Sequence, residues 1–274
     1  MGNLISKIGN ILFKKRMKRV LEVNSKSIDF NYTNGDRKLF TDDQHRHWDN
    51  IKENYFVLSK KILLKVVLPQ TGSHKGWITS RVELHVSQSL MRILYLVEEF
   101  CHASENFNSV AVAALVKSIS EIPLHLGYIV WVLSENHDFE KIRTELRKIS
   151  FGNINPKSGL TGSLKITQRE LYERSDQMMR KFFKDQPGFD IFESLYKDSN
   201  AIGHHNYEAR MLTGIQNGDT WKAGDRKELF VFFSNNIFQI FMYCDAALSM
   251  SKILLSAIDH YLSHLPENFT SFGG

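Results

Sequence analysis

The chain has 274 residues, of which 42% are hydrophobic and 24% are charged, as in an ordinary globular protein with a sizeable core. This composition excludes disordered, collagen-like and low-complexity classes. Two cysteines are too few for a disulfide framework, so we expect a reducing, cytoplasmic compartment. The net charge of +5 lies entirely in residues 1–22, because the remainder carries equal numbers of acidic and basic groups. The charge therefore predicts a basic segment attached to an electrically neutral body.

Residues 1–22 form the predicted basic amphipathic arm. Its apolar stripe is far shorter than the about 20 residues that a membrane span needs. We expect its cations to contact RNA phosphates or an anionic membrane surface, which would place the protein peripherally on a membrane. The alternative is a terminal helix that packs on the body with its charges in water, and the start also fits the myristoylation pattern at Gly2. The stripe comprises Leu4, Ile5, Ile8, Ile11 and Leu12, and the cations are Lys7, Lys14, Lys15, Arg16, Lys18 and Arg19.

Deleting residues 1–22 should leave the body folded, because the predicted core helices begin after about residue 42. The truncated protein should lose low-salt binding to anionic vesicles or RNA, since each lysine or arginine adds about 1 kcal/mol near an anionic surface. Salt should weaken the binding of the full chain. Vesicle sedimentation and RNA filter binding check this. Unfolding, or dissociation of an oligomer, on truncation would show instead that the arm is structural.

Helical periodicity dominates the chain after a polar connector at residues 23–42, which contains a turn signal at Asn34-Gly35. We expect one all-α, multi-helix bundle over residues 43–265, followed by a tail at 266–274. The third helix is apolar on most sides, which predicts a central position. The predicted helices run from Asp42 or Asp43 to about Leu68, 78–103, 109–134, 139–149, 167–184, 189–202 and 227–264, with loops at 70–77, 151–166 and 213–226.

A polar row interrupts the predicted central helix. Lys117, Glu121 and His125 follow each other at four-residue steps, and Tyr128 falls on nearly the same face. A buried lysine or glutamate is costly unless it is paired. The row is therefore either a functional site or a Lys117–Glu121 bridge that fixes the helix register.

A second polar row follows downstream. Tyr196, Ser199 and Asn200 step along the predicted 189–202 helix, which ends at a glycine turn with His204 and His205. Histidine titrates near neutral pH and can act as a general acid or base. The alternative is a helix C-terminus at which the two histidines face the negative end of the helix dipole.

Two groups of histidines lie close to aspartates in the sequence. His45 and His47 follow Asp42 and Asp43, while His260 and His264 are four residues apart on the last predicted helix, next to Asp259. Either group could bind a divalent metal with a further ligand. Solvated surface histidines are the simpler interpretation, and we expect neither a metal nor a cofactor.

The order of these motifs resembles a group of bacterial helical proteins and, more distantly, the HEPN superfamily (higher eukaryotes and prokaryotes nucleotide-binding). The first motif is Lys117-Ser118-Ile119-Ser120-Glu121, and the second is Tyr-x-x-Ser-x-x-x-x-His from Tyr196 to His204. The resemblance covers about residues 80–265. It implies a helical bundle, often a homodimer, and RNase activity in toxin–antitoxin, CRISPR or phage (antiviral) defence systems.

One departure from the HEPN pattern concerns the catalytic arginine. Catalytic members carry an arginine followed four to six residues later by a histidine, and no arginine has this spacing before His204 or His205. For an RNase, the resemblance implies that His204 transfers protons and that Lys117 and Glu121 complete the catalytic set. Lys117 or Arg210 would then stabilise the negative charge of the phosphorane. The alternative is a non-catalytic bundle that binds a nucleotide or a protein partner. The predicted binding residues are Tyr196, Ser199, Asn200, His205, Arg210 and His125.

Overall fold

The computed structural model describes residue 36, residues 38–63, residue 66, and residues 72–136, 138–151, 166–182, 191–203, 212–217, 219–237 and 239–269. Eight α-helices account for most of these residues, 81% of which are helical. The prediction of an all-α fold is therefore confirmed for the described chain. The arm at residues 1–22, most of the connector, and His204, His205 and Arg210 lie outside the described residues.

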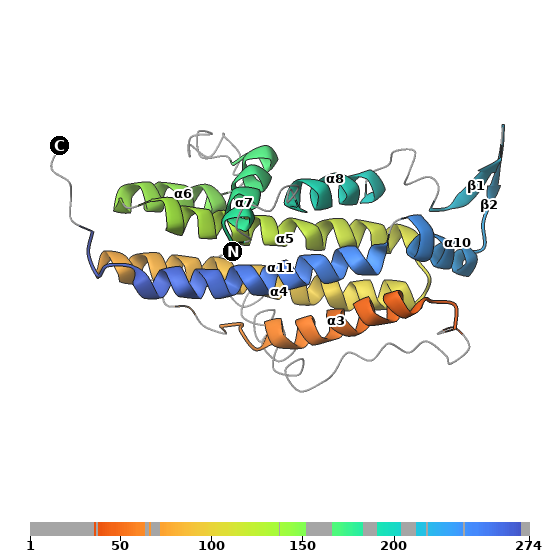
Figure 1. Cartoon of the computed structure of the whole chain (residues 1–274), viewed down its shortest axis with the longest axis horizontal. Helices are drawn as coiled ribbons and strands as arrows, with labels where there is room; N and C mark the ends of the chain where they lie inside the picture. Colours follow the sequence, from red (N-terminus) through yellow and green to blue (C-terminus); the bar gives the residue numbers. More distant parts are fainter. Residues whose placement is uncertain are drawn as a thin grey trace, which may run out of the picture.

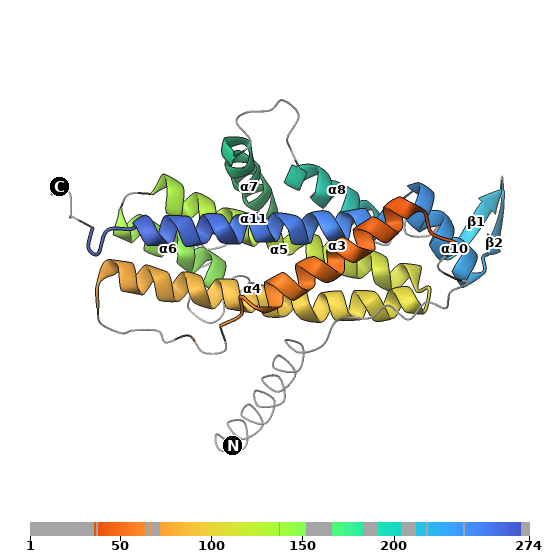
Figure 2. The ribbon, with the colours of Figure 1, turned by 60° about the horizontal axis from the view of Figure 1, so that its bottom comes forward.

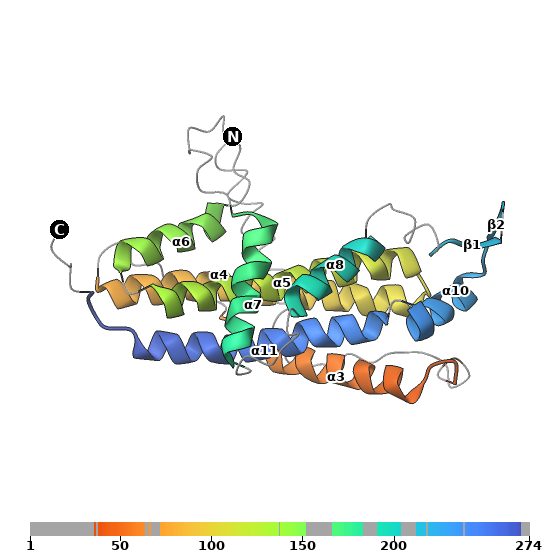
Figure 3. The same cartoon turned by 45° about the horizontal axis from the view of Figure 1, so that its top comes forward.

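Three long helices, α4, α5 and α11, lie side by side along the long axis of the molecule (Figure 1). Helix α3 runs obliquely over α4 and α11 (Figure 2), and α7 crosses the long axis (Figure 3). The elements are α3 (Asp42–Ser59), α4 (His74–Glu105), α5 (Ser109–Glu135), α6 (Phe139–Phe151), α7 (Gln168–Phe182), α8 (Ile191–Gly203), β1 (Gly214–Asn217), β2 (Thr220–Ala223), α10 (Arg226–Phe232), a π-helical turn (Phe233–Ile237) and α11 (Ile240–His264).

Helix α5 is the centre of the bundle, as predicted. It packs against α4, α6, α7, α8, α10 and α11. Its start is set by Asn108, whose side-chain oxygen accepts a hydrogen bond from the backbone N–H of Ala111 at 3.2 Å. Apolar side chains cover most of its circumference, so only a helix surrounded by others can bury them.

Helices α5 and α7 approach each other very closely where they cross. A Cβ atom on Gly127 would lie 2.5 Å from Ser175 Oγ and 3.1 Å from Ser175 Cα, so only glycine fits. The Ser175 hydroxyl lies 2.8 Å from the carbonyl oxygen of Leu124 in α5. The next residue, Asp176, caps α8 by accepting hydrogen bonds from the backbone N–H groups of Phe192 and Glu193 at 2.8 and 3.0 Å. The crossing thus fixes α7 against α5 and fixes the start of α8.

The predicted bounds of the first two helices were wrong. Helix α3 ends at Ser59, nine residues before Leu68, and Leu63 beyond its end is 45% exposed. Helix α4 begins at His74, inside the predicted loop, because the hydroxyl of Ser73 caps it by accepting a hydrogen bond from Gly76 N at 3.1 Å. The cap at Ser73 therefore places the start of α4 earlier than the apolar periodicity indicated.

The predicted loop at 213–226 contains an antiparallel hairpin, in which Gly214 pairs with Ala223 and Asn217 pairs with Thr220. The last predicted helix is also divided. After α10, the chain makes a π-helical turn and passes through Gln239 in the left-handed region, with φ 38° and ψ 46°. The amide of Gln44 donates to the carbonyl oxygen of Ser234 at 2.5 Å, so contacts from the start of α3 hold the backbone of this turn.

Two of the described helices, α5 and α11, are long and apolar enough to cross a membrane by length and composition. They pack against each other, and 56% of the apolar window of each is buried in the bundle. Burial against other helices is what a core helix requires, and it accounts for their composition without a membrane.

Candidate functional site

The polar row predicted on α5 faces helix α4. Arg92 of α4 places its Nη2 atom 3.7 Å from Oε2 of Glu121, which directs the Glu121 carboxylate towards α4. His125 lies one turn further along α5, and His85 of α4 is close enough for the two imidazoles to influence each other electrostatically. We call His85, Arg92, Glu121 and His125 the α4–α5 polar face. The ion-pair partner of Glu121 therefore comes from a neighbouring helix and not from the α5 row itself.

Both histidines of the polar face are neutral at neutral pH. His85 is 7% exposed, and its burial, together with His125 and the positive charge of Arg81, lowers its pKa to about 4. Burial and the charge of Arg92 also lower the pKa of His125. A neutral imidazole, unlike the protonated ring, can act as a general base.

The lowered pKa of His85 should make stability fall at acidic pH. The unfolded chain titrates near the ordinary pKa of 6.5 and the folded chain near 4, so between these values the unfolded state binds more protons. The contribution of neutral His85 is complete above the unfolded pKa and falls by up to about 3 kcal/mol as the pH approaches the folded pKa. Urea unfolding of the wild type and His85→Gln at about pH 7.5 and about pH 4.5 checks this. The variant should lose less stability on acidification, and equal losses would contradict the assignment.

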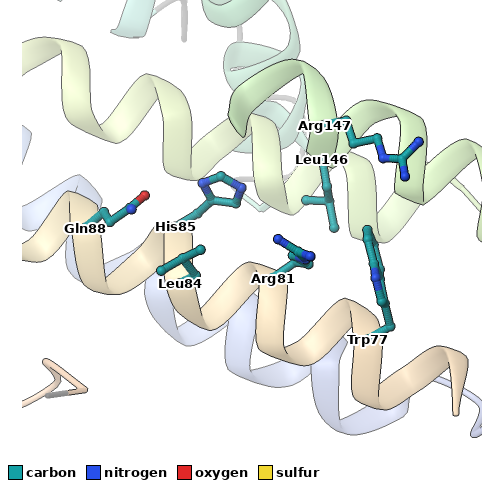
Figure 4. A pocket seen from close by; sticks show the side chains of 7 residues that line it. All are labelled: Trp77, Arg81, Leu84, His85, Gln88, Leu146 and Arg147. Atoms are coloured by element: carbon teal, nitrogen blue, oxygen red, sulfur yellow. The ribbon is translucent and has the colours of Figure 1, made fainter. Parts of the chain in front are cut away.

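A pocket of about 260 Å³ opens between α4 and α6 beside the polar face. Figure 4 shows Trp77 and Arg81 extending from α4 towards α6, which contributes Leu146 and Arg147. His85 lines the pocket and also belongs to the polar face, so a ligand in the pocket would reach the buried imidazole. The lining residues are Trp77, Arg81, Leu84, His85, Gln88, Leu146 and Arg147.

Positive charge in this α4–α6 pocket is not neutralised locally. The guanidinium carbon of Arg81 lies 5.4 Å from the ring centre of Trp77, and this ring contacts Phe139 edge-on at 5.6 Å. Within the described part of the chain, neither Arg81 nor Arg147 forms an ion pair with a carboxylate. The pocket lining also contains no aspartate or glutamate. Guanidinium groups in this state suit an anion with several oxygens.

Tyr128, at the end of the α5 row, makes a structural hydrogen bond to α6. Its hydroxyl donates a hydrogen bond to Glu145 of α6, which also forms an ion pair with Lys148 at 2.8 Å. Burial and the contact with Glu145 raise the pKa of Tyr128, so the phenol keeps its proton. The interaction holds α6 against α5 and thereby fixes one wall of the pocket.

A second polar cluster joins α3 to α11 around Asp245, which is 7% exposed. Its Oδ2 atom lies 2.8 Å from His47 Nδ1 and accepts a hydrogen bond from Asn50 at 3.0 Å. Its Oδ1 atom accepts from Asn54 at 3.2 Å and from Ser249 at 3.3 Å. We call these five residues the Asp245 cluster. Its carboxylate is fully engaged with protein donors, which indicates a structural role.

The histidine groups weighed as metal sites make other contacts. His47 is held by Asp245 rather than by the neighbouring Asp42 and Asp43, and His264 Nδ1 lies 2.8 Å from the carbonyl oxygen of His260. No group of three or more histidine, cysteine, aspartate or glutamate side chains is arranged to hold a metal ion among the described residues.

The downstream polar row lies partly in α8, which packs against α5 and α7. Tyr196, Ser199 and Asn200 belong to this helix, and the buried Oδ1 atom of Asn200 has no hydrogen-bond partner among the described residues. His204, His205 and Arg210 follow outside the described part of the chain. The structure thus joins Glu121 and His125 to His85 and Arg92, while the predicted grouping of His204 with Lys117 and Glu121 stays a prediction.

Sequence reasoning missed the contribution of α4. Trp77, Arg81, His85, Gln88 and Arg92 recur at helical spacing and share one face of that helix. This periodicity could have predicted a polar stripe on α4. The position of Arg147 in the pocket could not be predicted from sequence, because it depends on how α4 and α6 pack.

Comparisons with models of protein families, with curated proteins and with solved structures found no match. The chemistry of the polar face and of the α4–α6 pocket is therefore the basis for a function.

Proposed function

We propose that the protein is a HEPN-like RNA-binding bundle that cleaves RNA without a metal ion, using the α4–α5 polar face. One observation carries this proposal: the neutral imidazole of His85 lies at a pocket beside Arg81, which has no carboxylate partner among the described residues. RNA is the proposed substrate because the α5 and α8 motifs resemble those of the HEPN superfamily. The same resemblance is the reason for proposing a homodimer and a toxin-type role in antiviral defence.

The chemistry needs a proton acceptor and a cation around one phosphodiester. In the proposed step, His85 takes the proton of the ribose 2′-hydroxyl while the 2′-oxygen forms a new bond to phosphorus. The bond from phosphorus to the 5′-oxygen breaks, and the imidazolium returns its proton to that oxygen. The products are a 2′,3′-cyclic phosphate and a 5′-hydroxyl end. Arg81 stabilises the additional negative charge on the phosphate oxygens as the new bond forms.

The remaining residues of the face position these groups. Glu121 holds Arg92 next to His125, and the charge of Arg92 contributes to the lowered pKa of that histidine. Lys117 lies one turn before Glu121 on α5 and remains a proposed phosphate contact. His204 remains a proposed second proton carrier from the segment after α8.

Replacing His85 by glutamine should reduce RNA cleavage by about 10²–10⁴-fold, the usual contribution of a general base. Gel analysis of a labelled RNA in the presence of a chelator measures this loss. A matched control is His102→Gln, because His102 lies on the same helix with its side chain largely exposed. Thermal melting should show that each variant remains folded, with stability changes of about 1–2 kcal/mol.

The variant His204→Ala separates the two candidate centres. Loss of cleavage in His204→Ala but not in His85→Gln would move the reaction to the segment after α8. Retained cleavage in both variants would remove both histidines from the mechanism and overturn the proposed site. RNA binding by the wild type without any cleavage would favour the non-catalytic binding function.

A further inference from the structure

We infer that the α4–α6 pocket binds a terminal phosphate monoester, such as the 5′ phosphate of an RNA strand or of a mononucleotide. The inference rests on the proposed function only in naming RNA as a source of this group. The phosphate chemistry itself follows from the charge, the size and the donors of the pocket.

The charge of the pocket matches a dianion better than a monoanion. Arg81 and Arg147 line the pocket from different helices, and each carries a full positive charge without a carboxylate partner among the described residues. A phosphate monoester carries a charge of about −1.5 to −2 at neutral pH, whereas a phosphodiester within a strand carries a single negative charge. Nearby Glu145 does not supply the missing charge, because it is engaged by Tyr128 and Lys148. Two guanidinium groups are therefore balanced by one terminal phosphate.

The size of the pocket favours an end group. Its volume of about 260 Å³ is below the range of about 300–1,000 Å³ that is usual for pockets enclosing a drug-sized ligand. Leu84 and Leu146 provide apolar walls, and Trp77 packs against the Arg81 guanidinium. A guanidinium held by an aromatic ring loses less conformational entropy when it binds. One phosphate and an adjoining sugar would fill this space, while a run of nucleotides would have to continue outside it.

A neutral donor completes the pocket. The side-chain amide of Gln88 can donate to phosphate oxygens that the two arginines leave free. In Figure 4, His85 and Gln88 follow Arg81 along the same side of α4. The terminal phosphate would use the same Arg81 that we assign to the scissile phosphodiester, so the two groups would bind one at a time.

Paired ligands that differ only in the phosphate test this inference. Fluorescence anisotropy compares 5′-phosphorylated and 5′-hydroxyl forms of one RNA, and calorimetry compares AMP with adenosine. The wild type should bind the phosphorylated member of a pair about tenfold more tightly, a difference of about 1.4 kcal/mol. Arg81→Gln and Arg147→Gln should abolish the difference. Arg143→Gln should preserve it, because Arg143 lies on the same helix as Arg147 but is paired with Glu140 at 3.0 Å.

The outcomes separate this inference from the proposed function. A preference in the RNA pair assigns the phosphate to an RNA end, and a preference for AMP alone assigns it to a free nucleotide. Phosphate preference without RNA cleavage by the wild type would remove the proposed function and keep the pocket assignment. Equal binding within both pairs, or a preference that survives in Arg147→Gln, would overturn the inference. Thermal melting of Arg147→Gln confirms that the variant is folded.

Discussion

Asp245→Ala should destabilise the folded chain by about 3–5 kcal/mol, because several donors lose their acceptor at about 1–3 kcal/mol for each one that stays buried. The substitution removes the acceptor for His47, Asn50, Asn54 and Ser249 and leaves their donors facing a small cavity. Such a loss is a large fraction of the total stability of a typical domain, which is about 5–15 kcal/mol. Urea unfolding measures the free energy of unfolding directly.

A matched control for this prediction lies on the same helix. Asp259 is 70% exposed and forms its ion pair with Lys61 at 3.2 Å, so Asp259→Ala should change stability by less than about 1 kcal/mol. Asp245→Asn should fall between the two alanine variants, because an amide keeps one acceptor oxygen but loses the charge. Similar small effects for Asp245→Ala and Asp259→Ala would contradict the assignment of the Asp245 cluster as a buried link between α3 and α11.

Gly127→Leu should destabilise the protein by about 3 kcal/mol or more, at the upper end of the effects of overpacking. The first added carbon already lies 2.5 Å from Ser175 Oγ, and the rest of the side chain must displace α7. Gly127→Ala should be milder, because alanine gains about 1 kcal/mol of helix propensity that offsets part of the clash. Thermal or urea unfolding ranks the two variants.

Two further variants test the cause of this loss. Ser175→Gly removes the two side-chain atoms nearest the new methyl group, so it should recover part of the loss in Gly127→Ala through a positive coupling in a double-mutant cycle. Gly76→Ala is the helical glycine control, because its Cβ would approach only the Ser73 hydroxyl, at 3.3 Å. If Gly127→Ala is as well tolerated as Gly76→Ala, the close crossing of α5 and α7 is not a constraint.

The central helix could be predicted almost to the residue because its signals are local. Asn108 is a good capping residue, and the apolar run that follows needs burial wherever it lies. The hairpin after α8 also had a local signal, since Gly218-Asp219 separates Asn217 from its strand partner Thr220 and this dipeptide favours tight hairpin turns. The interruption of the last helix near Gln239 had no local sequence signal. It depends on Gln44, 190 positions earlier in the chain, reaching the carbonyl group of Ser234.

The candidate site likewise combines residues that sequence spacing identifies with contacts that only helix packing determines. The α5 row with Glu121 and His125 follows from four-residue spacing, and the corresponding stripe on α4 was equally readable. The pairing of Glu121 with Arg92 instead depends on which helices become neighbours, and so does the presence of Arg147 and Arg81 in one pocket. Spacing along one helix thus identifies candidate residues, while packing decides which of them share a pocket.

The central position of α5 has a consequence for biosynthesis. Its main apolar partner, α11, ends at His264, roughly 130 residues after α5 ends, which corresponds to about 6–26 s of translation at usual rates. During this interval α5 leaves the ribosome with its apolar surface incompletely covered, although its length and composition resemble those of a membrane span. The nascent chain therefore exposes apolar surface, which is prone to aggregation, until α11 arrives to cover it.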